Sequence, residues 1–114
     1  MTFAEAAENG NIEKLKVFLS AGADPNEEKD DDWPPLLNAA YADQVEAARL
    51  LLDAGADMYK PHSGGETPLL MAGQTGSIGV FRLLLERGYQ LDVERDNAAP
   101  QYRTKFKLAS SFQA

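Results

Sequence analysis

Apolar residues recur along the chain in short blocks at a constant interval. Three apolar triplets, each followed three residues later by a glycine, are spaced by 33 residues: Val-Phe-Leu at 17–19 with Gly22, Leu-Leu-Leu at 50–52 with Gly55, and Leu-Leu-Leu at 83–85 with Gly88. A period of this length indicates an array of one repeated supersecondary unit. We expect a single domain over 1–114, with repeats at about 1–33, 34–66 and 67–99.

The pattern within each repeat predicts two short antiparallel helices. In the second repeat, Pro35 suits the first position of a helix, where the missing N–H costs nothing, and Asp43 interrupts that helix. Apolar residues then recur at helical spacing from Val45 to Leu52, and Gly55 supplies the left-handed conformation that ends helices. The repeat therefore predicts a helix-turn-helix unit, and the chain an all-α solenoid.

The two ends of the array carry different signals. Thr2 and Glu5 have the spacing of a capping box, which would fix the start of the first helix. Residues 104–109 imitate the helix opening that begins at Thr67, but Thr104 follows Thr67 by 37 residues and not by 33. We expect a partial capping repeat at 100–114, because the ends of a solenoid need a covering element. A frayed tail is the alternative.

These motifs resemble those of a known family. Gly-Glu-Thr-Pro-Leu at 65–69 is similar to the Gly-x-Thr-Pro-Leu pattern of ankyrin repeats, and Asp-Ala-Gly-Ala-Asp at 53–57 is similar to the ending of such a repeat. The resemblance extends from Met1 to about Val93 and implies an ankyrin-repeat solenoid of about three repeats. It also implies protein recognition, without naming the partner.

Two departures from the family pattern affect the turns. Asp32-Trp33-Pro34 stands where the pattern has Gly-x-Thr, so we expect that turn to have a different shape. Leu37 and Leu70 occupy the position at which the pattern has histidine. The turns therefore lack the histidine network that the resemblance implies for them.

Composition and charge narrow the function. The chain has 44% hydrophobic residues, no cysteine and no apolar run long enough to span a bilayer, so we expect a soluble, cytoplasmic protein stabilised by packing alone. Its net charge of −7 is uneven, with −6 in 1–33, −3 in 34–66 and +2 in 67–114. An acidic chain is a poor ligand for nucleic acid and a better one for a protein with a basic surface.

The resemblance also places the expected binding residues, in the turns and at the exposed ends of the first helices of each pair. They are Glu28, Asp30, Asp31, Trp33, Tyr41, His62, Ser63, Glu66, Gln74 and Thr75. Trp33 is the only tryptophan, and aromatic anchors carry much of the energy of an interface. The alternative for Trp33 is a packing role against Pro34 or Pro35, since large aromatic residues are mostly buried.

No catalytic, cofactor or metal site is expected. His62 and Ser63 are adjacent, whereas a nucleophile and its base meet across a fold. The alternating oxygen ligands at 24–30 resemble a calcium loop, but lysine stands at its sixth position, where glycine is needed. The glycines at 64 and 65 are not followed by Gly-Lys-Ser/Thr, so they form no phosphate loop and instead suit a turn.

Four functions are compatible with these features of the sequence. The leading one is a non-catalytic interaction module that binds a partner through its turns and first helices. The alternative is a small inhibitor or immunity-type protein whose acidic first turn blocks the basic site of an enzyme. An enzyme at the His62 and Glu66 turn is remote, because stacked helix pairs offer only an open groove. We expect a monomer, with head-to-tail self-association through the basic tail as a further possibility.

Overall fold

A computed structural model describes residues 1–28, 33–62, 64–92 and 96, and these residues form helices and turns without a strand. The helices are α1 (Phe3–Asn9), α2 (Ile12–Ser20), α3 (Pro35–Tyr41), α4 (Val45–Asp53), α5 (Pro68–Thr75) and α6 (Ile78–Glu86). Each repeat contributes two of them, as the 33-residue pattern predicts. The partial repeat expected at 100–114 lies outside the described residues.

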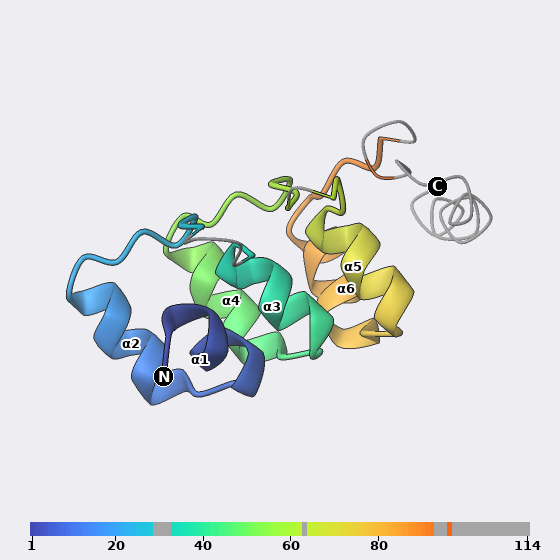
Figure 1. Cartoon of the computed structure of the whole chain (residues 1–114). Coiled ribbons are helices and arrows are strands. Elements are labelled where there is room, and N and C mark those ends of the chain that lie inside the picture. The colour runs from blue at the N-terminus through green and yellow to red at the C-terminus, as the bar shows by residue number, and fades with distance from the viewer. Residues whose placement is uncertain (29–32, 63, 93–95, 97–114) are drawn as a thin grey trace.

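The helices form two parallel rows. The first helices of the pairs make one row, in which α3 contacts both α1 and α5, and the second helices make another, in which α4 contacts both α2 and α6. Figure 1 shows the three pairs side by side, with the turns between pairs along one edge. We call these turns the first finger (21–34) and the second finger (54–67). The stack measures 40 × 27 × 20 Å, and the predicted all-α solenoid is confirmed.

Small residues let the rows pack closely. Ala6, Ala39 and Ala72 stand at the same position of successive first helices, and all three are buried. Leu51 and Leu84 are also fully buried, on the second helices that face them. A single pair buries little on its own, so each repeat depends on its neighbours for its core.

Most helix caps occur at the residues that the sequence predicts. The Thr2–Glu5 capping box is present: the Glu5 N–H donates to Thr2 Oγ1 at 3.0 Å, and the Thr2 N–H to Glu5 Oε1 at 3.3 Å. Thr67 caps α5 by accepting from the Leu70 N–H at 3.2 Å. Pro34 precedes α3 and offers no such side-chain bond, so this helix start differs from that of α5.

Successive fingers are tied together by side chains at one repeated position. Asn26 accepts from the Asp57 N–H at 2.6 Å and donates to the carbonyl oxygen of Gly55 at 3.2 Å. Tyr59, 33 residues further on, accepts from the Gln90 N–H at 3.0 Å. Since Leu37 and Leu70 are buried in the core, the fingers are linked through this position and not through the family's histidine.

The turn between α3 and α4 contributes a cap to the next repeat. Asp43 has φ 53°, and the equivalent positions in the other repeats, Gly10 and Gly76, have φ 67° and 73°. A side chain is disfavoured in this left-handed conformation, although aspartate tolerates it better than most residues. Asp43 Oδ1 accepts from the Val80 N–H at 2.9 Å and so caps the first turn of α6.

The segment after α6 is anchored by a buried carboxylate. Asp96 Oδ1 accepts from the hydroxyl of Thr67 at 2.8 Å and from the hydroxyl of Tyr89, and Asp96 Oδ2 accepts from the Asp92 N–H at 3.0 Å. Asp96 has no exposed surface. The residue that caps α5 therefore also holds the chain that leaves the last repeat.

Candidate protein-interaction surface

Trp33 lies at the end of the first finger and joins residues of two repeats. Its ring stacks on the His62 imidazole, with centroids 5.5 Å apart and planes at 10°. It also meets Tyr41 edge to face, with centroids 5.7 Å apart at 66°. Trp33 is partly buried and packs against the core, so a packing role and a binding role for it are not exclusive.

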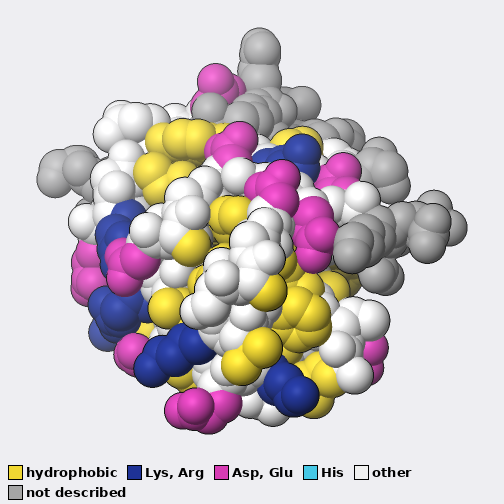
Figure 2. All heavy atoms as spheres, turned by 90° about the vertical axis from the view of Figure 1, so that its left-hand side faces the viewer, with side chains coloured by type: hydrophobic (Ala, Val, Ile, Leu, Met, Phe, Trp, Pro, Cys, Tyr) yellow, Lys and Arg dark blue, Asp and Glu magenta, His cyan; other side chains and the backbone are white. Residues whose placement is uncertain are grey.

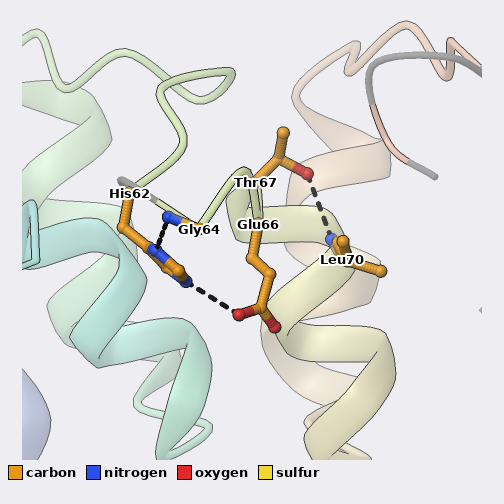
Figure 3. A network of polar contacts seen from close by, with 5 residues as sticks. All are labelled: His62, Gly64, Glu66, Thr67 and Leu70. Carbon is orange, nitrogen blue, oxygen red and sulfur yellow. Dashed lines mark hydrogen bonds and ion pairs between the residues drawn. The ribbon is translucent and has the colours of Figure 1, made fainter. Parts of the chain in front are cut away.

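The second finger holds His62 in a closed turn beside the start of α5. His62 Nε2 and Glu66 Oε1 are 2.8 Å apart, while the Gly64 N–H donates to His62 Nδ1 at 2.6 Å. Figure 3 shows the His62 and Glu66 side chains pointing toward one another. Because Nδ1 accepts, these contacts fit the tautomer with its proton on Nε2, which donates to Glu66. The backbone supports this arrangement, since the Gly65 N–H donates to the His62 carbonyl oxygen at 2.9 Å.

This turn presents Trp33 with a hydrogen-bonded surface. The side chain of His62 is 14% exposed and that of Glu66 is 27% exposed, so each is held by the fold while one edge still meets solvent. Both ring nitrogens of His62 are engaged, which leaves neither free to act as a base toward a bound molecule. We define the Trp33 cluster as Trp33, Tyr41, His62 and Glu66.

The first helices extend this surface along the stack. Tyr41 ends α3 with 49% of its surface exposed, and Gln74 occupies the equivalent position on α5. Asn38 lies one turn before Tyr41, on the same face of α3. In the described part of the chain, Asn38 Oδ1 and Gln74 Nε2 are buried without a hydrogen-bond partner. No sequence motif points to Asn38, because its unpaired oxygen depends on tertiary packing.

Of the remaining expected binding residues, the structure describes Thr75 and Glu28. Thr75 bonds within its own repeat. Its Oγ1 is 3.0 Å from the Met71 carbonyl oxygen of α5 and 2.8 Å from Ser77 Oγ, which precedes α6. Glu28 is exposed in the first finger. Asp30, Asp31 and Ser63 lie outside the described residues.

Two of the oxygen ligands that resemble a calcium loop, Asp24 and Asn26, have structural roles. Asp24 Oδ1 accepts from the Asn26 N–H at 2.9 Å, and Asn26 links the two fingers. Within the described ranges, no group of three or more histidine or acidic residues could hold a metal ion. In the same part of the chain, no helix is long and apolar enough to cross a membrane.

Stacked helix pairs joined by protruding turns, with aromatic and polar residues gathered beside those turns, define a repeat solenoid that presents an open surface. A family model of ankyrin repeats, in three copies, matches residues 3–95. The chain therefore belongs to the ankyrin-repeat family, whose domains are generally protein-protein interaction modules and typically non-catalytic. No curated protein matches it closely enough to count as a relative.

Proposed function

We propose that this chain binds a partner protein at the Trp33 cluster and along the adjoining face of α3 and α5, and that the bound segment is basic. The observation that carries the proposal is the position of Trp33 between His62 of the next finger and Tyr41 of the first helix row. An anchoring residue needs both a fixed orientation and an exposed edge. The ring of Trp33 is oriented by its stacking on His62, and the residue is only partly buried.

The negative charge of this chain supports a basic segment in the partner. Glu66 is partly exposed next to the aromatic rings, and the first 33 residues carry a net charge of −6. An arginine or lysine side chain stacked on Trp33 or Tyr41 would gain a cation–π contact and the attraction of Glu66 together. Such contacts are worth about 0.5–2 kcal/mol each, depending on how much water they exclude.

The two unpaired amide atoms favour a peptide-like ligand. A buried polar atom without a hydrogen bond costs about 1–3 kcal/mol, and pairing it on binding recovers part of that cost. Asn38 Oδ1 could accept from a backbone N–H, and Gln74 Nε2 could donate to a backbone carbonyl, after small rotations of the side chains. An extended segment of the partner offers both kinds of group.

The test compares two substitutions of partly buried aromatic residues. Proteins captured from cell extract on the wild-type chain are identified by mass spectrometry, and their binding to Trp33→Ala and Phe81→Ala is measured by titration. Phe81 lies on α6, away from the Trp33 cluster, and is likewise partly buried against the core. We expect both variants to lower the melting temperature, but only Trp33→Ala to weaken binding, by about 2 kcal/mol or roughly thirtyfold.

Equal loss of binding in the two variants would mean that Trp33 matters only for folding. Binding that does not weaken as salt rises would contradict the basic segment, because attraction between exposed charges is screened.

A second candidate is an inhibitor whose acidic first finger blocks the basic site of an enzyme. Glu28 is exposed at the described edge of that finger, and Asp30 and Asp31 follow it in sequence. Charge reversal at Asp30 and Asp31 would abolish inhibition if the finger enters the site. A variant with unchanged inhibition would rule this mode out, whereas binding through the Trp33 cluster would persist in it.

A further inference from the structure

Two backbone groups at the start of each turn receive a side chain from the finger before it. Asn26 of the first finger donates its amide N–H to the Gly55 carbonyl oxygen at 3.2 Å and accepts from the Asp57 N–H at 2.6 Å. In the next repeat the N–H of Gln90, which is equivalent to Asp57, donates to the hydroxyl of Tyr59 at 3.0 Å. Successive repeats are therefore joined at the same pair of positions.

The first finger has the same two groups in the same conformation. Gly22 and Gly55 have φ 91° and 101°. Asp24 Oδ1 accepts from the N–H two residues further on at 2.9 Å, as Asp57 Oδ1 does at 2.8 Å. Among the residues that the structure describes, none bonds to the Gly22 carbonyl oxygen or to the Asp24 N–H. The outer edge of the first finger therefore presents the acceptor and the donor that Asn26 engages one repeat later.

A pocket of about 370 Å³ opens beside these two groups. Its lining includes Gly22 itself and the side chains of Phe3, Phe18 and Trp33. Figure 2 looks onto this end of the stack and shows hydrophobic side chains across its centre. Sites that enclose small ligands have volumes of about 300–1,000 Å³, so the pocket has room for one large apolar side chain.

The last repeat shows what packs at this position inside the array. Tyr89 is the equivalent of Ala23, two repeats further on, and its ring centroid lies 4.6 Å from that of Tyr59 in the second finger. A large side chain from the preceding finger therefore covers that position. Ala23 is small and lines the pocket, so a large apolar side chain from outside the chain fits over it in the same way.

We propose that the outer edge of the first finger and this pocket together bind an extended segment of a partner protein, through an asparagine and a large apolar residue. The asparagine amide donates to the Gly22 carbonyl oxygen and accepts from the Asp24 N–H, as Asn26 does one repeat later. Side chains two residues apart in an extended segment point to the same side, so the apolar residue stands two positions from the asparagine. This site does not depend on the basic segment proposed for the Trp33 cluster.

The charge of the first finger disfavours an aspartate in place of the asparagine. Glu27 lines the pocket, and Glu28 follows it and is exposed. Aspartate offers no donor to the Gly22 carbonyl oxygen and adds a like charge beside these two carboxylates. Asparagine and aspartate have nearly the same shape, so exchanging them in a bound peptide tests the recognition of the amide itself.

The test selects binders from a displayed library of random peptides, with the full chain as the bait. We expect enrichment of an asparagine with a large apolar residue two positions away. In a selected peptide, replacing this asparagine by aspartate should weaken binding by about tenfold or more, because a hydrogen bond is lost and repulsion is added. No enrichment, or enrichment of a different pattern, would overturn the proposal.

Ala21→Arg blocks the pocket, and Ala54→Arg is its matched control. Ala21 ends α2 and lines the pocket, whereas Ala54 ends α4 with nearly the same backbone angles and does not line it. The third repeat has Arg87 at this helix end, so the fold accepts arginine there. Peptide binding should be lost in Ala21→Arg and unchanged in Ala54→Arg. Equal binding to both would place the peptides elsewhere, and self-association abolished by Ala21→Arg would put a second copy in the pocket; either result refutes the proposal.

Asp24→Pro and Asp24→Ala separate the backbone donor from the side chain. Both remove the carboxylate that accepts from the Asn26 N–H, but only proline also removes the N–H of residue 24. Binding should be about fivefold weaker in Asp24→Pro than in Asp24→Ala, the effect of one hydrogen bond, and equal binding would contradict the proposal. If Asp24→Pro does not fold, hydrogen exchange of the wild-type Asp24 amide decides: a bound peptide should slow it, and an unchanged rate would overturn the proposal.

Discussion

Asp43 offers the sharpest test of how the repeats are coupled. It combines a disfavoured backbone conformation, φ 53°, with a carboxylate that caps α6 of the next repeat at 2.9 Å. A helix cap is worth about 1 kcal/mol, and the left-handed conformation costs an alanine about 1–2 kcal/mol. Asp43→Ala loses the cap and meets the full backbone cost, so we expect it to lower the free energy of unfolding by about 2 kcal/mol.

Two further substitutions at Asp43 separate the terms. Asp43→Asn keeps an acceptor and tolerates the conformation, so only the interaction of the charge with the helix is lost, about 0.3–1 kcal/mol. Asp43→Gly also loses the cap, but glycine adopts the left-handed conformation at little cost, as Gly10 and Gly76 do. The lost cap and the relieved backbone strain should therefore nearly cancel in the free energy of unfolding.

Urea denaturation measures the free energy of unfolding of all three variants. A shift of the midpoint at an unchanged slope against urea concentration gives the change in stability. The reasoning fails if Asp43→Gly is as damaging as Asp43→Ala, because backbone strain would then play no part. It also fails if Asp43→Asn is as damaging as Asp43→Ala, since the cap and the tolerated backbone are both retained in it.

Three other substitutions test the packing by thermal melting. Gly79→Ala should destabilise by about 1–2 kcal/mol although alanine favours helices, because its Cβ would lie 2.5 Å from Val45 Cγ2; a higher melting temperature would contradict this. Thr67→Val should cost about 2 kcal/mol by removing the α5 cap and the bond to Asp96, and a neutral result would show that this network adds nothing. Ile78→Ser should change stability by less than about 0.5 kcal/mol in dilute solution, because that side chain is largely exposed, and a larger loss would mean that it is covered.

The fold could be predicted from the sequence because its signals are local. Helix starts such as Thr2 and Thr67, and turns such as that at Gly55, depend on backbone preferences within a few residues, and all of them occur as expected. The candidate site could be predicted less completely. Trp33, Tyr41, His62 and Glu66 were identified separately, but their assembly into one cluster was not, because it joins two repeats.

The sequence by itself determined the class of this protein: a 33-residue period with two helical faces allows an array of helix pairs and little else. Only the tertiary structure decided which side chains cross from one repeat to the next. Three such contacts join residues about 30 or more positions apart: Asn26 links the fingers, Asp43 caps α6, and Trp33 stacks on His62. Such contacts depend on the distance and angle between stacked repeats, and those follow from the packing of the whole core and not from any local preference.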